Sequence, residues 1–118
     1  MSVKIDPSDV ARVVARRPYA YVVTASDDGR PHMRAVVPRW STSVAAFTVR
    51  VGSQTSRNVE RTGTVTLMWP PIPGGEAVEE FDDHTVIADC NARCVSEGDS
   101  FELVATPSHA VWHRPARA

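Results

Sequence analysis

Residues 19–37 read YAYVVTASDDGRPHMRAVV, a run that predicts two antiparallel strands joined by a tight turn. Residues 19–25 form the first predicted strand, and both of its faces are fairly apolar. Gly29 closes the polar stretch that follows and can adopt the positive φ that a hairpin turn requires. The second strand is expected from about His32 to Val37.

The residues that precede the hairpin predict a short helix. Asp6 can cap its N-terminus, Pro7 suits the first helical position, and Pro18 ends it. The face that this helix is expected to bury consists of Val10, Val13 and Val14. We expect the helix to cover one end of the sheet.

The residues that follow the hairpin predict four more strands and two more short helices. The expected strands span residues 44–51, 64–69, 85–95 and 101–105. One helix is expected to begin at Ser53 and end at Gly63, and Thr106 and Pro107 resemble the start of a short closing helix. The acidic stretch from Glu76 to Asp83 is interpreted as a solvated loop or a helical turn. Six antiparallel strands with short helices at the corners predict a mainly β protein with a small barrel.

Composition supports a sheet and excludes several classes of protein. Eighteen valines stand beside two leucines and three isoleucines, and valine fits a pleated surface well. No apolar run approaches the roughly 20 residues of a membrane span, and no signal peptide is recognised, so we expect a cytoplasmic protein without a membrane partner. Cys90 and Cys94 would lie about 13 Å apart on one strand face, so we expect free, buried thiols. The length predicts one domain over residues 1–118.

The net charge of −1 conceals an asymmetry between the two halves of the chain. Residues 1–62 carry ten Arg or Lys and five Asp or Glu, a balance of +5. Residues 63–118 carry three basic and nine acidic residues, a balance of −6. If the chain recognises an anion, we therefore expect the first half to do so. A genome rich in G and C would also explain why twelve of the thirteen basic residues are arginine.

Residues that could bind an anion gather at the junction between a predicted strand and a predicted helix. Thr48 and Arg50 lie two residues apart near the strand end, and therefore on one face. The start of the helix, where unpaired N–H groups carry partial positive charge, then supplies Ser53, Thr55, Ser56, Arg57 and Asn58. Arg34 on a neighbouring strand can contribute from the same face. This arrangement predicts a phosphate site; the alternative is an ordinary N-cap at Ser53 with arginines on the surface.

The order of these elements is similar to that of a known family. After the first helix come the strand YVVTA, an Asp-Gly hairpin, and the segments PHMRAVVPRW, AFTV, GSQTSRNVER and VTLMW. Over residues 1–70 this order resembles the pyridoxamine 5′-phosphate oxidase-like split-barrel family, and residues 106–115 resemble it more weakly. The resemblance implies a six-stranded antiparallel split β-barrel of the FMN-binding type. It also implies an oxidoreductase that forms a homodimer, with FMN or the deazaflavin coenzyme F-420 at the subunit interface.

The resemblance also implies binding roles for individual residues of this chain. The cofactor phosphate would be held by Thr48, Arg50, Ser53, Thr55, Ser56, Arg57 and Asn58. The isoalloxazine or deazaflavin ring would lie near Arg34, Val36, Val37 and Pro38. This chain departs from the family at Thr55, where many relatives carry Lys or Arg, and we find no C-terminal arginine and histidine motif of the true oxidase. Oxidation of pyridoxamine phosphate itself is therefore not expected.

Two other classes of function stay open beside an oxidoreductase that acts on a small organic substrate. In a flavin enzyme the ring carries the redox chemistry, so no catalytic side chain is assigned. The first alternative is a non-catalytic module that binds, stores or senses a ligand in its barrel. The second is an interaction protein with an empty barrel. Nucleic-acid binding is not expected, because no stretch of the chain stays basic for long.

The remaining histidines and the tryptophans carry weaker signals. His109 and His113 would share one face of a helix, but a third zinc ligand is not identified, and packing or exposure is the favoured interpretation. His32 is interpreted as a satisfied polar residue that could face a substrate. Trp40, Trp69 and Trp112 are expected in the core or an interface, with Trp69 preferred for a dimer contact or the rim of a pocket. No metal is predicted.

Overall fold

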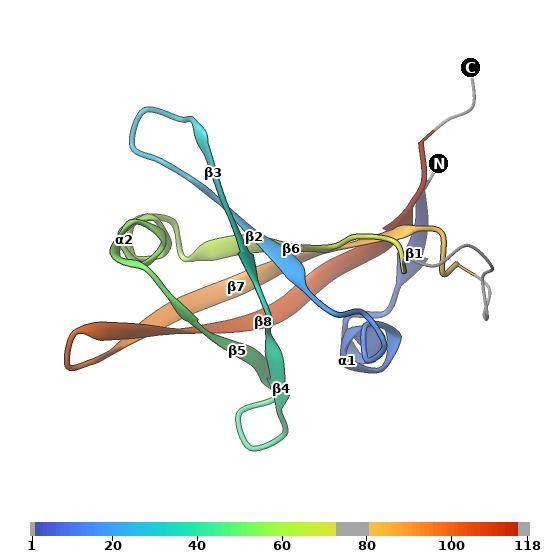
Figure 1. Ribbon diagram of the computed structural model, residues 1–118, viewed down its shortest axis with the longest axis horizontal. Coiled ribbons are helices and arrows are strands. Elements are labelled where there is room, and N and C mark those ends of the chain that lie inside the picture. Colours follow the sequence, from blue (N-terminus) through green and yellow to red (C-terminus); the bar gives the residue numbers. More distant parts are fainter. Residues whose placement is uncertain (1, 73–80, 116–118) are drawn as a thin grey trace.

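The computed structural model describes residues 2–72 and 81–115, and its strands form one antiparallel sheet (Figure 1). The strands are β1 (Ser2–Ile5), β2 (Ala20–Ala25), β3 (Pro31–Val36), β4 (Arg39–Ser41), β5 (Ala46–Val51), β6 (Thr64–Trp69), β7 (Thr85–Glu97) and β8 (Ser100–His113). The predicted mainly β fold is confirmed. The described residues form eight strands rather than the six expected, because β1 and β4 were not predicted.

The hairpin at the centre of the prediction is confirmed as β2 and β3. Its register runs from Ala20 opposite Val36 to Ala25 opposite Pro31. Gly29 has φ 82°, a conformation that glycine adopts without steric cost. Side chains of β2 that lie on the inner face, such as Val22, are fully buried. The hairpin therefore contributes one wall of the core.

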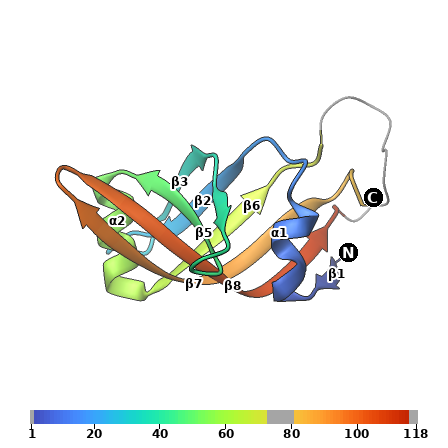
Figure 2. The same ribbon diagram turned by 90° about the horizontal axis from the view of Figure 1, so that it is seen from below.

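Short helices cover the two ends of the sheet, as Figure 2 shows. A 3-10 turn (Pro7–Asp9) leads into α1 (Val10–Val13), and the Asp6 carboxylate accepts a hydrogen bond from the Ser8 N–H at 2.9 Å, so the predicted cap is confirmed. The helix ends well before Pro18. At the other end lies α2 (Ser53–Thr62), which stops at Gly63 with φ 71° as predicted. Its N-cap is Gly52, so Ser53 is a helical residue and not the cap.

The sheet curls into a barrel that stays open along one line. Its strands follow the order β3-β2-β6-β7-β8-β5-β4, with β1 paired to β8. Among the described strands, β3 pairs only with β2 and β4 pairs only with β5. Only Val37 and Pro38 separate β3 from β4 along the chain, so the two edges of the sheet meet at one corner. Figure 1 shows β3 and β5 diverging from that corner, and we call the gap between them the split.

The inner face of the curled sheet forms the core. Leu67 and Leu103 are fully buried, and Trp69, at 2% exposure, contacts Phe47 with ring centroids 5.2 Å apart. Trp69 is therefore a core residue, and the expectation that it lies at a dimer contact or a pocket rim is wrong. Trp40 packs edge-on against Phe47 at 5.0 Å. No helix among the described residues is long and apolar enough to cross a membrane.

The C-terminal part of the chain differs from the prediction. Thr106 and Pro107 do not begin a helix, because β8 continues to His113. A bulge opposite Asp89 and Cys90 interrupts the register at this point, and β8 pairs with β5 before it and with β1 after it. Proline is tolerated there because bulges and unpaired edges need fewer N–H donors.

The acidic segment between β6 and β7 is only partly described. Residues 76–80 of the predicted solvated loop lie outside the described residues. Asp82 is buried, and its carboxylate lies 2.6 Å from the Arg16 guanidinium, so the prediction of a solvated loop is wrong at this position. Cys90 and Cys94 are both free, with Cys90 buried and Cys94 half-buried.

Candidate functional site

A cavity of about 470 Å³ occupies the split at the end nearest α2. Three elements line it: the inner face of β3, the end of β5 and the first turn of α2. It brings together five of the residues predicted to bind a cofactor: Arg34, Val36, Arg50, Ser53 and Thr55. The residues on β3 lie more than a dozen positions before those on β5 and α2, and the curl of the sheet places both groups around one space.

The register of β2 and β3 explains which side chains face this cavity. Arg34 lies opposite Val22 and Val36 lies opposite Ala20, and both partners are fully buried on the inner face. Paired residues of an antiparallel ladder point to the same side of the sheet. Arg34 and Val36 therefore lie on the inner side, although β3 is an edge strand and leaves the Arg34 side chain exposed to the split.

The cavity has the electrostatic character that an anion requires. Arg34 and Arg50 contribute two positive charges, and no carboxylate is found among the described residues that line it. The first backbone hydrogen bond of α2 runs from the Ser56 N–H to the Gly52 carbonyl at 3.1 Å. The N-cap residue, Gly52, has no side chain to cap the helix, so the N–H groups of the first turn keep their capacity to bind an anion. A Cβ added to Gly52 would meet no atom within 4 Å, so the approach to these groups is open.

Two of the other predicted residues line a second, smaller cavity beside the first. Thr48 and Val37 border a space of about 250 Å³ that shares Arg50 with the larger cavity. Arg39 lies opposite Thr48 across β4 and β5, but Glu97 and Glu102 line the same space. Two arginines therefore face two glutamates, and this cavity is balanced in charge.

The remaining predicted residues line neither cavity. Asn58 is fully buried: its amide nitrogen donates to the Thr24 hydroxyl at 3.0 Å, and its amide oxygen accepts from Gln54 at 2.9 Å. Ser56 is buried at 7% exposure, whereas Arg57 is exposed and donates to the Gln54 side-chain oxygen at 2.8 Å. Pro38 lies half-buried at the corner between β3 and β4.

His32 lines the cavity, although it was not among the predicted cofactor-binding residues. Both of its ring nitrogens are shielded from solvent and have no hydrogen-bond partner among the described residues. Burial, and to a lesser extent the nearby Arg34 charge, lowers the pKa of His32 below its usual value. The period of two along β3 was the available signal, because His32 lies on the same face as Arg34.

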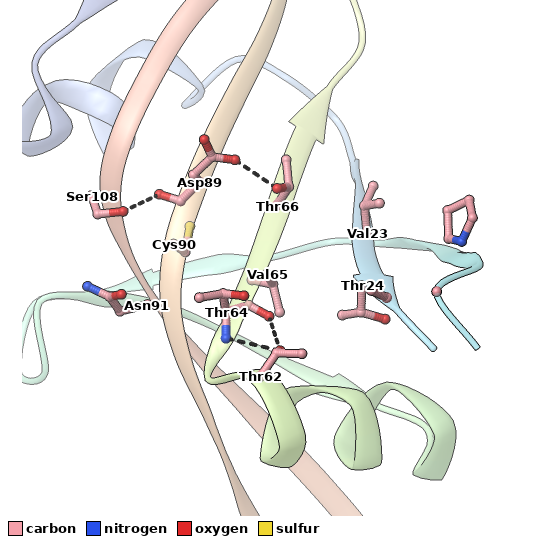
Figure 3. Close-up of a pocket in the computed structure, with 13 residues that line it drawn as sticks. Val23, Thr24, Thr62, Thr64, Val65, Thr66, Asp89, Cys90, Asn91 and Ser108 are labelled. Carbon is pink, nitrogen blue, oxygen red and sulfur yellow. Dashed lines mark hydrogen bonds between the residues drawn. The ribbon is translucent and has the colours of Figure 1, made fainter. Parts of the chain in front are cut away.

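A different cavity, of about 490 Å³, lies on the outer face of the sheet beside the end of α2 (Figure 3). Its polar lining consists largely of Thr62, Thr64, Thr66, Asp89, Asn91 and Ser108. The Asp89 carboxylate accepts a hydrogen bond from the Thr66 hydroxyl at 2.8 Å, as Figure 3 shows. No basic residue is among the described residues that line this cavity, so it does not favour an anionic cofactor.

The histidines considered as metal ligands lie on β8 rather than on a helix. His109 Nδ1 is 3.6 Å from the Asp89 carboxylate, and His113 Nδ1 is 3.0 Å from the Ser2 hydroxyl. Among the described residues, no group of three His, Cys, Asp or Glu side chains could hold a metal ion. The helical arrangement on which the zinc alternative depended is therefore wrong.

Comparisons with known proteins add a family and a set of structural neighbours. The family model described as pyridoxamine 5′-phosphate oxidase matches residues 7–116. Among curated sequences, "Uncharacterized protein Mb0449c" of Mycobacterium bovis is 27% identical over 125 residues, which cover 96% of this chain and 82% of that protein.

Three solved structures share the fold at low sequence identity. An FAD-binding protein of Mesorhizobium loti gives a TM-score of 0.69 at 8% identity and covers 95% of this chain and 96% of its own. An F420 reductase gives a TM-score of 0.61 at 13% identity, and the match covers 84% of this chain and 94% of the reductase. HutZ, the heme storage protein of Vibrio cholerae, gives a TM-score of 0.64 at 14% identity, and the match covers 92% of this chain and 94% of HutZ. The similarity to these structures is a similarity of fold.

Proposed function

Because this chain belongs to the pyridoxamine 5′-phosphate oxidase family, we propose that it binds FMN in the split and uses it to oxidise or reduce a small organic substrate. The observation that carries the proposal is the cavity between β3 and β5, which combines two arginines with the free N-terminus of α2. A phosphate dianion placed there would contact Arg34, Arg50 and the first N–H groups of the helix. Arginine binds phosphate oxygens in a bidentate geometry, and a helix N-terminus adds a complementary partial charge.

The residues of this chain would hold and orient the cofactor. The flavin ring supplies the redox chemistry when it is bound, so the protein contributes binding, orientation and electrostatics. Val36 on β3 offers an apolar contact beside Arg34, and the Ser53 hydroxyl lies at the start of α2. The open space at Gly52 leaves room for the phosphate next to the backbone.

The charge of the smaller cavity favours FMN over a deazaflavin coenzyme with a long acidic tail. Such a tail would have to continue past Arg50 toward Arg39. Glu97 and Glu102 line that path and would oppose further negative charge. FMN requires only the positively charged cavity near α2. The deazaflavin coenzyme is the alternative ligand, and the same titration tests both.

We also propose that two copies of the chain associate through the outer face of the sheet. Register pairs place Tyr21 beside Ala35 and Met68, and Ile87 beside Met68 and Val111, on the outer side. Met33 on the edge strand is 44% exposed. A continuous apolar face of this kind is typical of homodimer interfaces. Light scattering coupled to size exclusion should show a dimer that Met33→Asp weakens. Val44→Asp, at an exposed valine in the turn between β4 and β5, should leave the dimer intact.

Titration of the purified protein with FMN and with the deazaflavin coenzyme tests the proposed function. We expect FMN binding, with a flavin absorption spectrum that shifts on saturation. Arg34→Ala and Arg50→Ala should each weaken the affinity about tenfold to a hundredfold, the value of one charge-assisted hydrogen bond. The matched control is Arg12→Ala on the exposed side of α1, where the side chain is 75% exposed and far in the fold from the split.

The possible results separate the proposed enzyme from its alternatives. A folded protein that binds neither cofactor would refute the proposal. Binding followed by reduction of the cofactor, without turnover of any acceptor, would favour the non-catalytic module. Binding that is unaffected by both Arg34→Ala and Arg50→Ala would show that the cofactor lies outside the split.

A further inference from the structure

His32 lies in the wall between two cavities. It lines the cavity of the split and also a shallower hollow of about 460 Å³ beneath the turn that joins β2 to β3. Gln54 lines both spaces as well, so the imidazole and this amide form the boundary between them. On the sheet, His32 lies opposite Thr24 and two residues before Arg34 on the inner face. The ring is therefore positioned at the edge of the proposed phosphate site.

Nearby polar side chains are already engaged with other partners. The Thr24 hydroxyl accepts a hydrogen bond from the Asn58 amide nitrogen. The Gln54 amide nitrogen donates to the Asn58 side-chain oxygen, and the Gln54 amide oxygen accepts from Arg57. Both nitrogens of His32 have no hydrogen-bond partner among the described residues and no access to solvent. A buried polar group in this condition is unfavourable in the free protein, and a ligand that provides a hydrogen-bond partner removes the cost.

Burial sets the protonation state of His32 together with the charged groups around the ring. They comprise Arg34 on its own strand, Arg50 across the split, and Asp27, Asp28 and Arg30 on the adjoining turn. The two carboxylates are paired within that region, Asp27 with Arg61 at 3.1 Å and Asp28 with Arg30 at 3.5 Å. Burial and the Arg34 charge lower the pKa of His32, so its ring is neutral at pH 7 when the split holds no anion.

We propose that His32 is a phosphate-binding residue that takes up a proton when the phosphate of the cofactor enters the split. This inference rests on the proposed function, because it assigns the phosphate of FMN to that cavity. A phosphate dianion offsets the positive charge of Arg34 and Arg50 and therefore favours the imidazolium form of His32. The imidazolium has two N–H donors. One can donate a hydrogen bond to the phosphate, and the other can donate to an acceptor on the side of the turn between β2 and β3.

Coupled proton uptake makes the affinity depend on pH in a defined direction. Because the bound state holds more protons than the free state, affinity should increase as pH falls from 8 to 6.5. Uptake of one full proton can change the FMN affinity by at most tenfold per pH unit, and we expect the affinity to change by about threefold to tenfold between pH 8 and 6.5. The phosphate itself is half protonated at about pH 6, so the measurement stays above that value, where the dianion predominates.

Isothermal titration calorimetry with FMN, in buffers of different ionisation enthalpy at pH 7, measures the proton uptake directly. We expect uptake by the wild-type protein and its loss in His32→Gln, with weaker FMN binding. His109→Gln is the matched control, because His109 lies on the outer face with a side chain that is 58% exposed, and its proton uptake should equal that of the wild type. Riboflavin, which has no phosphate, should bind without proton uptake.

A second variant separates a binding role from a structural one. His32→Leu removes the two unpartnered nitrogens, so the thermal midpoint of the free protein should be unchanged or higher while FMN affinity falls at least tenfold. FMN binding without proton uptake, or uptake that persists in His32→Gln, overturns this inference and leaves the proposed function intact. Absence of FMN binding in the folded wild-type protein overturns both.

Discussion

Replacement of Asn58 by alanine should destabilise the protein far more than it affects a bound cofactor. The Asn58 side chain is fully buried, and it joins α2 to β2 through the Thr24 hydroxyl at 3.0 Å and to Gln54 at 2.9 Å. Two lost hydrogen bonds cost about 1 kcal/mol each, and the vacated volume adds about 1 kcal/mol, so the free energy of unfolding should fall by about 3 kcal/mol. With a urea m-value of about 1.5 kcal/mol/M, the midpoint should fall by about 2 M.

A double-mutant cycle with Thr24→Val isolates the bond between the helix and the sheet. The valine keeps the shape of threonine and removes the hydroxyl, so the coupling energy with Asn58→Ala should be about 1 kcal/mol. The FMN affinity of folded Asn58→Ala should stay within about threefold of the wild type. That difference in binding free energy is smaller than the contribution of one hydrogen bond. A loss of stability below about 1 kcal/mol, together with a large loss of FMN affinity, would refute this reasoning and return Asn58 to the phosphate site.

Three further predictions test other parts of the structure. Gly52→Ser should stabilise α2 by a few tenths of a kcal/mol in urea unfolding and weaken FMN binding in titration, because its hydroxyl would compete for the first N–H groups; unchanged affinity would contradict the site. Arg17→Met should lower the free energy of unfolding by about 3 kcal/mol, because the buried guanidinium donates to the Phe81 and His84 carbonyls at 3.1 and 2.5 Å; a loss below about 0.5 kcal/mol in urea would contradict this. Burial raises the pKa of Cys90 to about 12, so only about one thiol in 10⁴ is ionised at pH 8 and a disulfide reagent should label Cys90 only after unfolding; rapid labelling of native protein would contradict the burial.

Local chemistry explains which parts of the fold were predictable. Gly29 and Gly63 have φ values of 82° and 71°, a requirement that the sequence displays directly as glycine at a turn and at a helix end. The strand expected at residues 64–69 coincides with β6, because alternating threonine and apolar residues mark its two faces. Where a residue type is needed for a backbone conformation, the sequence alone identifies the element.

Elements that depend on distant partners could not be predicted in this way. β4 has three residues, too few for an alternation to be recognised, and it exists because β5 pairs with it. β1 pairs with the far end of β8, more than a hundred residues along the chain. Pro107 has a local preference for the start of a helix, but the bulge and the change of partner strand make a β conformation favourable there.

The candidate site also combines residues that the sequence identifies with residues whose orientation depends on distant packing partners. Arg34 and Arg50 could be named from charge and strand period, and the fold brings both to one cavity. Asn58 follows Arg57 in sequence, yet the helical rotation turns Asn58 inward to Thr24 and leaves its neighbour exposed. Sequence spacing gives a residue's position along the helix, but the packing partner that decides its orientation lies on another strand.

The corner formed by Val37 and Pro38 gives the split the mechanics of a hinge. The two flanks are covalently joined there by a two-residue link, one of whose residues has a fixed φ, so they cannot move apart at that point. Any widening must grow with distance from the corner, toward α2, where β3 and β5 diverge in Figure 1. The split can thus widen for a bulkier ligand at the end near α2, while its width at the corner of Val37 and Pro38 stays constant. Amide hydrogen exchange along β3 should therefore slow progressively from His32 toward Val36.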